Sequence, residues 1–158
     1  MKCRKTNKQM ATEQYPKAYL YKRIVQAKVF IDSNYADNID INQISDEAFF
    51  SKFHFIRLFK QTYGKTPHQY LTTVRIDNAI LLFQKGTPVS TVCYTVGFES
   101  LSSFSGLFKK NVGISPAAFL AKEINRKRQM ITNPMNFISA CFAHKFGWTE
   151  NSNFEEAK

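Results

Sequence analysis

The sequence has few cysteines, and they lie far apart. Cys3, Cys93 and Cys141 are odd in number and form no C-x-x-C pair, which argues against a disulfide framework or a structural zinc site and favours a reducing compartment. No apolar run approaches the roughly 18 residues that span a membrane. No apolar signal core follows the charged start M-K-C-R-K-T-N-K. We therefore expect a soluble intracellular protein without a membrane partner.

The sequence also lacks the residue combinations of common enzymes. It contains no paired carboxylates, no nucleophile beside a base and no glycine-rich phosphate loop. His54, His68 and His144 are scattered, and Cys141 with His144 offers only two of the ligands that a zinc site needs. We predict that the protein is not an enzyme and uses no metal or other cofactor.

Positive charge and aromatic side chains are abundant instead. The 158 residues carry a net charge of +10 and include 15 Phe and 7 Tyr, and the apolar fraction of 44% is typical of a folded protein. The basic surplus favours a polyanionic partner such as nucleic acid or an acidic membrane surface. Residues 1–34 hold eight basic and two acidic residues, whereas residues 35–125 hold nine and seven. Any positive face in the centre therefore depends on a few well-placed side chains.

Apolar residues recur at helical spacing along most of the chain, and capping residues divide the pattern into short helices. We predict an all-α fold with helices over residues 16–34, 41–48, 52–63, 67–85, 89–96, 101–112 and 116–128, preceded by a disordered basic arm over residues 1–14. The predicted helix starts are Asp40 with Gln43, Ser51, Thr66-Pro67, Thr87-Pro88, Ser100 and Ser115-Pro116, and the predicted stops are Gly64, Gly86 and Gly113. A further short helix is predicted after Asn133-Pro134, stopping at Gly147.

The stretch S-K-F-H-F-I-R-L-F-K from Ser51 to Lys60 predicts a helix with two different faces. One face is apolar and suits a small core, while the other combines apolar bulk with positive charge and suits an anionic partner. The inner residues are Phe55, Leu58, Phe59 and Thr62, and the outer residues are Phe53, Ile56, Arg57 and Lys60.

This helix belongs to a repeat. At an offset of 49, positions 49–71 overlay positions 98–120 with nine identities in 23 pairs, most of them at caps, core positions or helix breakers. The identical pairs are Phe49/Phe98, Ser51/Ser100, Phe55/Phe104, Leu58/Leu107, Phe59/Phe108, Lys60/Lys109, Gly64/Gly113, Pro67/Pro116 and Leu71/Leu120. The sequence thus encodes one helix-turn-helix unit twice. This is a duplication and not a solenoid, which needs at least three units.

With two such units joined by one helix, the chain resembles the AraC/XylS family of bacterial transcription regulators over roughly residues 25–123. The passages that carry the resemblance are S-K-F-H-F-I-R-L-F-K-Q-T-Y-G-K-T-P-H-Q-Y-L-T-T-V-R from Ser51 and V-G-F-E-S-L-S-S-F-S-G-L-F-K-K-N-V-G-I-S-P from Val96. The resemblance implies seven helices in two homeodomain-like units that read adjacent major-groove segments. The expected organisation is an arm (1–14), a first unit (15–64), a linker helix (65–86), a second unit (87–128) and a C-terminal extension (129–158).

The resemblance also implies which residues contact DNA. The matching positions are Lys52, Phe53, Ile56 and Arg57 in the first unit and Leu101, Ser102, Ser103 and Gly106 in the second, with Lys60, Lys109 and Lys110 as phosphate contacts. Arg57 can fork onto guanine or clamp a phosphate, and Phe53 can touch a thymine methyl. Gly106 replaces the arginine usual in the family, so we expect the first unit to dominate readout. Arg75 is expected to tie the two halves together, and the other expected structural residues are Gly64, Pro67, Gly97, Phe98, Gly113 and Pro116.

Plainer explanations remain open at this point. Phe53 can instead pack against its own domain, and Arg57, Lys60 and Lys109 can be ordinary solvated charges. Residues 137–148 are expected to form an extra packed helix in preference to a partner-binding one. The main prediction is a stand-alone transcription regulator in the bacterial cytoplasm at the nucleoid, whose partners are double-stranded DNA and, as a candidate, RNA polymerase. We expect an activator, with a repressor as the alternative, because the sequence does not give the sign of regulation. The alternative is a protein-interaction module with a degenerate second unit. The sequence identifies no effector ligand.

Overall fold

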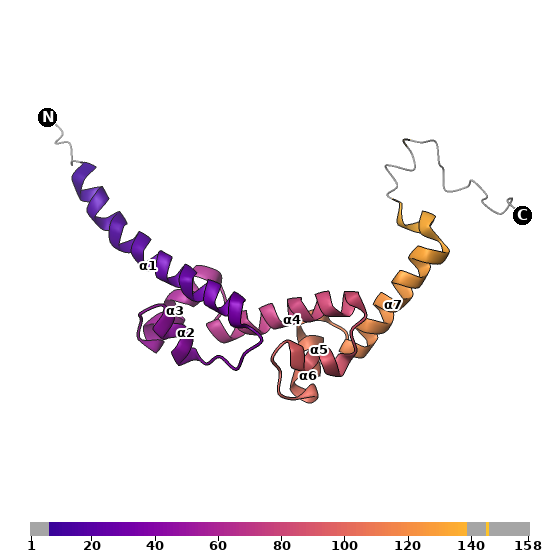
Figure 1. Ribbon diagram of the computed structural model, residues 1–158. Coiled ribbons are helices and arrows are strands. Elements are labelled where there is room, and N and C mark those ends of the chain that lie inside the picture. The colour runs from indigo at the N-terminus through magenta and orange to yellow at the C-terminus, as the bar shows by residue number, and fades with distance from the viewer. Residues whose placement is uncertain (1–6, 139–144, 146–158) are drawn as a thin grey trace, which may run out of the picture.

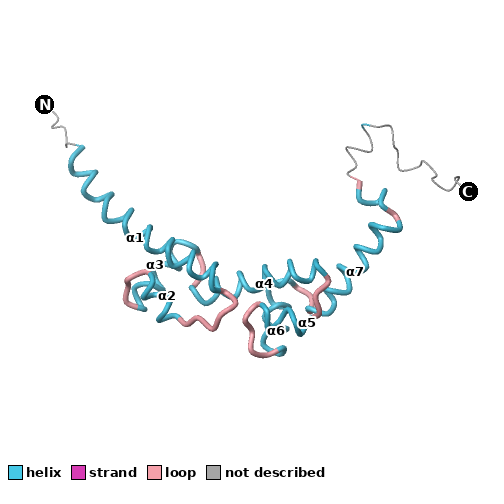
Figure 2. Tube along the Cα trace, in the orientation of Figure 1, coloured by secondary structure: helices cyan, strands magenta, loops and turns pink. Residues whose placement is uncertain are grey.

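The computed structural model describes residues 7–138 and residue 145, and all regular structure in these residues is helical (Figures 1 and 2). The α-helices are α1 (Asn7–Asn34), α2 (Ile41–Glu47), α3 (Lys52–Tyr63), α4 (Pro67–Lys85), α5 (Val89–Thr95), α6 (Leu101–Val112) and α7 (Pro116–Thr132), followed by a short 3-10 helix, η1 (Pro134–Phe137). The prediction of an all-α fold with seven helices is confirmed.

Local side-chain caps begin several of these helices where the sequence predicts them. The carboxylate of Asp40 accepts a hydrogen bond of 2.8 Å from the backbone N–H of Gln43, whose side chain accepts one from the backbone of Asp40. Thr66 and Gln69 form the same reciprocal capping box at the start of α4. These contacts satisfy backbone N–H groups that have no partner inside the helix.

Two predictions about helix starts are wrong. The first helix begins at Asn7 and not at Pro16, so residues 7–14 are helical and do not form a disordered arm. Lys, Gln, Met, Ala and Glu in this stretch all favour helix, which explains the longer element. Thr87 does not cap α5, which has no side-chain cap hydrogen bond. The N–H of Thr87 instead donates to the carbonyl of Leu82 (3.2 Å) and closes the last turn of α4. Pro88 is the N-cap residue of α5.

The C-terminal part of the chain also differs from the prediction. The helix α7 continues to Thr132, four residues beyond its predicted end at Arg128. The short helix predicted after Pro134 is a single 3-10 turn that ends at Phe137. Residues 139–144 and 146–147 of that predicted helix, including Cys141 and His144, lie outside the described residues, as do Cys3 and the chain from Thr149 onward.

The helices build two separate cores that share one element. The first core contains Ile24, Ala27, Ile31, Ile44, Ala48, Phe55, Phe59 and Leu71. The second contains Ile76, Ala79, Phe83, Val92, Cys93, Val96, Phe98, Phe104 and Phe108. The N-terminal half of α4 therefore contributes a buried residue to the first core, and its C-terminal half contributes buried residues to the second. The segment predicted as a linker, 65–86, is part of both units, and Tyr35 packs against both cores.

The shared helix α4 determines the shape of the molecule. In Figure 1 the pairs α2–α3 and α5–α6 lie on the same side of α1 and α4, while the outer ends of α1 and α7 rise at opposite ends. The two helix-turn-helix units are therefore carried side by side on a common helical backbone.

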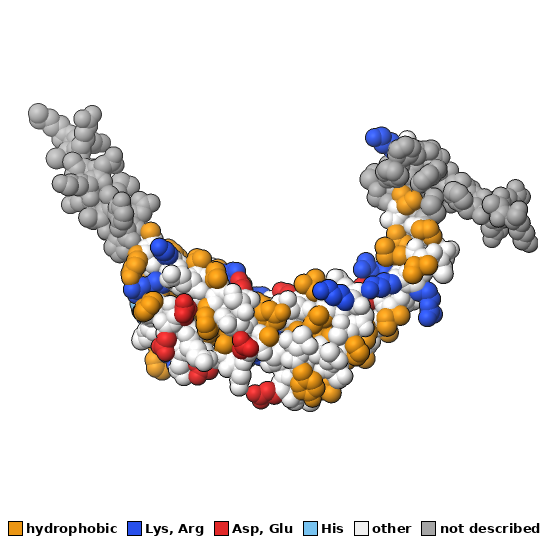
Figure 3. Space-filling model, in the orientation of Figure 1, with side chains coloured by type: hydrophobic (Ala, Val, Ile, Leu, Met, Phe, Trp, Pro, Cys, Tyr) orange, Lys and Arg blue, Asp and Glu red, His pale blue; other side chains and the backbone are white. Residues whose placement is uncertain are grey.

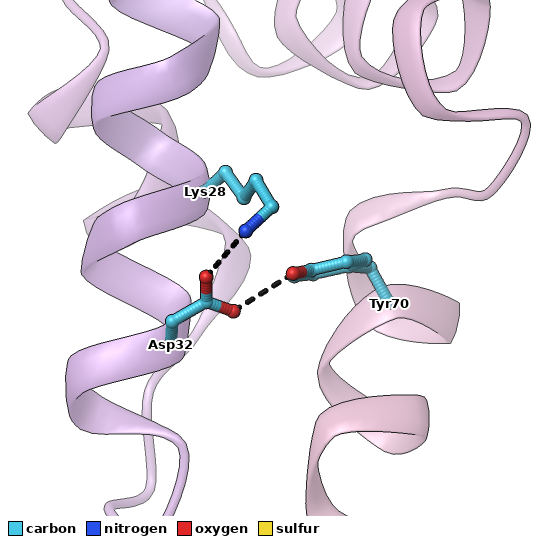
Figure 4. A network of polar contacts seen from close by, with 3 residues as sticks. All are labelled: Lys28, Asp32 and Tyr70. Atoms are coloured by element: carbon cyan, nitrogen blue, oxygen red, sulfur yellow. Dashed lines mark hydrogen bonds and ion pairs between the residues drawn. The ribbon is translucent and has the colours of Figure 1, made fainter. Parts of the chain in front are cut away.

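A polar network fixes α1 against the start of α4 (Figure 4). Asp32 pairs with Lys28 on its own helix, with Nζ and Oδ2 2.6 Å apart, and accepts a hydrogen bond of 2.8 Å from the hydroxyl of Tyr70. The hydrogen bond to Asp32 raises the pKa of Lys28, and burial raises the pKa of the Tyr70 hydroxyl. Both groups therefore keep their protons at neutral pH and donate to the carboxylate of Asp32, which ties α1 to the start of α4.

Of the helices that the structure describes, none has the length and apolar character needed to cross a membrane.

Candidate nucleic-acid interface

The helix α3 is held by its inner face and presents its outer face to solvent. Phe55 and Phe59 are completely buried in the first core, and Gly64 ends the helix in the left-handed conformation with φ of 70°. On the outer face the Phe53 side chain is 85% exposed, which excludes the explanation that it packs against its own domain. The other exposed candidate residues of this helix are Lys52, Arg57 and Lys60.

Ile56 occupies a different environment from its neighbours. It is half-buried and lines a groove of about 580 Å³ between the start of α2, the middle of α3 and the start of α4. Ile41, Ile44 and Leu71 also line this groove. Ile56 is thus partly withdrawn from the outer face, whereas Phe53 and Arg57 are not.

The corresponding face of α6 is nearly featureless. Leu101 is 40% exposed, and Ser102, Ser103 and Gly106 are exposed. A Cβ built on Gly106 would meet no atom within 4 Å, so the glycine is not required by packing. The positive charge of this helix comes only from its last turn, where Lys109 and Lys110 are exposed.

Ser103 lies on the outer face of α6, but both its backbone and its side chain are hydrogen-bonded to Ser100. Its backbone N–H donates to Oγ of Ser100 (3.2 Å), and its own Oγ accepts a hydrogen bond of 2.9 Å from that hydroxyl. Ser103 is therefore part of the N-terminal cap of α6. At the offset of 49, the residue that corresponds to Ile56 is Ser105, which the sequence-based selection missed although the repeat itself identifies it.

The turns that precede α3 and α6 differ by one residue. Phe50 donates its N–H to Ser45 O (3.1 Å), and Phe98 donates in the same way to Cys93 O (3.0 Å), so these two phenylalanines occupy equivalent places. The pairing of Phe49 with Phe98, which a constant offset of 49 gives, is therefore wrong in the structure, where Phe98 corresponds to Phe50. Phe49, with φ of 53°, takes the place of Gly97, with φ of 85°.

Arg75 of α4 joins the two units. Its Nε donates to the carbonyl of Tyr35 (2.7 Å) and an Nη to that of Asp37 (2.8 Å), both in the loop before α2. Its guanidinium also lies over the ring of Phe98, 5.5 Å from the centroid. Burial lowers the pKa of Arg75, and the charge of Glu99 opposes that shift.

Gly97 is required at the same junction. A Cβ on this residue would lie 2.4 Å from the backbone carbonyl oxygen of Ala36, which is far inside contact distance. The loop of the first unit and the turn of the second therefore approach each other so closely that only glycine fits. The other predicted structural positions terminate or begin helices: Gly64 and Gly113 are left-handed C-caps, and Pro67 and Pro116 are buried first residues.

The exposed cations of α3 and α6 are available to an external anion. In the part of the chain that the structure describes, the ion pairs are Lys28–Asp32 and Glu123–Arg126, and neither involves α3 or α6. On the face shown in Figure 3, acidic side chains gather around α2 and the loop before it, while basic ones lie over α1, the C-terminal end of α4 and α7. That face does not offer a continuous basic surface.

Residues that would support catalysis are not brought together among the described residues. No three His, Cys, Asp or Glu side chains lie close enough there to hold a metal ion. His54 packs edgewise on Phe50 with ring centroids 5.3 Å apart, and Cys93 is buried in the second core.

Comparisons with known proteins give a consistent result. A family model described as a helix-turn-helix domain matches residues 44–122. The probable transcriptional regulator LumQ of Photobacterium leiognathi is 36% identical over 91 residues, which cover 57% of this chain and 37% of LumQ. Matches to the next two curated relatives cover 26% and 33% of their lengths, so the chain spans about a third of such relatives.

Solved structures with the same arrangement of helices include a DNA-binding domain and a transcriptional regulator. The DNA-binding domain of AdpA, solved in complex with a target DNA, is 27% identical with a TM-score of 0.64, covering 67% of this chain and 96% of that one. A regulator from Chromobacterium violaceum with an AraC-type DNA-binding domain is 23% identical with a TM-score of 0.61, covering 65% and 93%, and supports the fold alone.

Proposed function

Because this chain belongs to the AraC-type family of helix-turn-helix transcription regulators, we propose that it binds a specific site in double-stranded DNA and regulates transcription there. The outer face of α3 is the observation that carries the proposal. Two fully buried phenylalanines hold this helix, while Phe53, Arg57 and Lys60 are exposed beside one another. Such a helix can enter a major groove and offer an apolar group to thymine and a guanidinium to guanine.

The arrangement of α4 supports engagement of two groove segments. This helix has 19 residues and is about 28 Å long at 1.5 Å per residue. It carries α2–α3 and α5–α6 on the same side (Figure 1), and successive major-groove segments on one side of a duplex lie roughly 34 Å apart. One chain can thus place α3 and α6 in adjacent segments without a second copy.

The two units contribute unequally in this proposal. Arg57 on α3 can make two parallel hydrogen bonds to guanine, whereas its counterpart Gly106 has no side chain. Phe53 and Lys52 on α3 are the other candidate base-reading residues of the first unit. The second unit then adds phosphate contacts through Lys109 and Lys110, which strengthen binding without selecting a sequence.

Substitutions of Arg57 test base reading directly. After the preferred site is found by selection from a random duplex pool, Arg57→Ala should weaken binding to it by about 1–3 kcal/mol. Arg57→Lys is the matched control, because it keeps the charge but loses the planar fork. If the Arg57→Lys variant binds the site with the full affinity of the unmodified chain, Arg57 contacts phosphate only. Unchanged affinity and specificity in both variants would refute its role.

Lys109 supplies the complementary test. Lys109→Ala should weaken binding to all duplexes alike and reduce the slope of log K against log salt by about one unit. A selection that returns no preferred sequence would instead favour the alternative, a protein-interaction module. Two selected boxes one helical turn apart would indicate that both units bind, and one box would indicate a dominant first unit.

The same proposal places the protein in the bacterial cytoplasm at the nucleoid. Contact with RNA polymerase would make it an activator, and in vitro transcription with purified polymerase tests that contact. Activation that depends on the selected site would support it, whereas reduced transcription would identify a repressor.

A further inference from the structure

The duplication extends further than the helix-turn-helix units. Comparison of α1 with α4 at an offset of 52 pairs their core residues, and all of them are at most 2% exposed. The pairs are Ile24/Ile76, Ala27/Ala79 and Ile31/Phe83. Each unit therefore has an equivalent first helix, and α4 serves as the first helix of the second unit.

An arginine precedes the first of these core residues in both helices. Arg23 of α1 and Arg75 of α4 lie at the same offset of 52. The guanidinium of Arg23 lies over the ring of Phe50 at 5.7 Å, and that of Arg75 lies over Phe98 at 5.5 Å. Since Phe50 and Phe98 occupy equivalent places, each arginine reaches from the first helix of its unit to the turn before the third.

The two arginines differ in their other contacts. Arg75 binds carbonyls of the neighbouring unit, whereas Arg23 stays within its own. Its Nη1 donates to the carbonyl of Phe49 (3.3 Å), and its guanidinium lies over the rings of Tyr19 (4.3 Å) and Phe49 (5.4 Å) and also donates to the Tyr19 hydroxyl.

The contact of Arg23 with Phe49 supports an unfavourable backbone conformation. Phe49 has φ of 53°, and it is the one positive-φ residue other than glycine in the described chain. Bulky side chains disfavour this left-handed conformation, and the ring is 73% exposed, so burial does not hold it in place. The turn also lacks support from α3 itself, because Ser51 makes no side-chain capping hydrogen bond, whereas Ser100 at the start of α6 does.

We propose that Arg23 is a positioning residue for DNA readout: by pinning the left-handed turn at Phe49, it sets the orientation of α3 and hence of Arg57, without contacting DNA. This inference rests on the proposed function. Four residues, 48–51, separate α2 from α3, so a change in the dihedral angles of Phe49 alters the direction in which α3 leaves the turn, while Phe55 and Phe59 keep its inner face in the core. A bidentate contact tolerates little misplacement, so sequence discrimination is lost before non-specific attraction is.

The test compares three variants of the full chain. Arg23→Met removes the charge and the plane, and Arg23→Lys keeps the charge but not the plane. Lys22→Met is the matched control, because Lys22 is the adjacent exposed cation on α1 and the net charge changes equally. The measurements are the ratio of specific to non-specific affinity, the salt slope, and the backbone amide chemical shifts of α3 and α6.

Arg23→Met should lower the specificity ratio about tenfold, within the range that one bidentate base contact supplies. The salt slope should stay unchanged, and amide shifts should move in α3 more than in α6. Arg23→Lys should not rescue the ratio, and Lys22→Met should leave it intact. A drop of the salt slope by about 0.9 in Arg23→Met, with rescue by Lys, would identify a phosphate contact and overturn the proposal.

The proposal can also be tested if Arg23→Met does not fold or if the chain selects no DNA sequence. If Arg23→Met does not fold, Tyr19→Leu removes one ring and one hydrogen-bond acceptor of Arg23 at unchanged charge, and it should reduce the specificity ratio by a smaller factor. An unchanged ratio in a folded Tyr19→Leu protein overturns the proposal. If the unmodified chain selects no DNA sequence, the proposed function fails instead. The amide shifts then still decide whether Arg23 orients α3.

Discussion

Gly106 offers the sharpest test of how the second unit is used. It lies inside α6 at the position that corresponds to Arg57 of α3, and a Cβ there would meet no atom within 4 Å. Gly106→Ala should therefore raise the free energy of unfolding by about 1 kcal/mol, because glycine is less favourable than alanine in a helix by that amount. In a domain of this size the melting temperature should rise by roughly 4 °C.

Gly106→Arg should give a similar gain in helix stability, and it also places a guanidinium on the outer face of α6. If α6 lies in the second groove segment, the new side chain reaches a phosphate or a base edge. A phosphate contact should steepen the slope of log K against log salt by about 0.9. A bidentate contact should add about 1–3 kcal/mol for duplexes with guanine at the facing position.

The two substitutions separate stability from binding. Thermal unfolding followed by circular dichroism measures the first effect, and fluorescence anisotropy titrations at several salt concentrations measure the second. Gly106→Ala should melt higher and bind DNA as the unmodified chain does. If Gly106→Arg then matches Gly106→Ala in affinity and salt slope, the outer face of α6 does not lie on DNA. The placement of α6 in a second groove segment would be refuted.

Two further predictions concern stability. Gly113→Ala should cost about 1 kcal/mol for its positive φ alone, whereas Gly97→Ala should cost clearly more, because its Cβ would lie 2.4 Å from the carbonyl oxygen of Ala36; equal costs in urea unfolding would contradict the close approach. Asp40 caps α2, and the hydrogen bond from the Gln43 N–H lowers its pKa below the ordinary value of 3.8. Its stabilising contribution is therefore complete above that ordinary value and is lost as the pH falls through the lowered pKa. Asp40→Asn keeps a cap but should flatten the pH dependence of the melting temperature between about pH 5 and pH 2; an unaltered pH profile would show that the Asp40 carboxylate does not contribute.

Most helix boundaries were predictable because their causes are local. Asp40 and Thr66 meet their partners three residues further on, and Gly64 ends a helix through its own φ. Such contacts depend only on residue type and spacing. The prediction for Thr87 was wrong, because a residue between two helices can begin the second or close the first, and the backbone N–H of Thr87 closes α4. Its neighbour Gly86 decides in favour of closing α4.

The repeat was predictable only where its spacing is constant. The third helices correspond at an offset of 49, but the second helices correspond at 48, as Ile44/Val92 and Ala48/Val96 show, and the first helices at 52. Turns of different length cause these shifts. A comparison at one offset therefore mispairs Phe49 with Phe98 and misses the first helix altogether.

The sequence by itself determined the number and order of the seven helices, most of their boundaries and the outward position of Arg57, since helical periodicity assigns a face to each residue. Only the tertiary structure decided what orients α3. Arg23 meets Phe49 across 26 positions of the chain, and Arg75 meets Tyr35 across 40. No periodicity or cap relates residues so far apart. Their contacts follow from the packing of α1 and α4 against the turns, which sets where each third helix points.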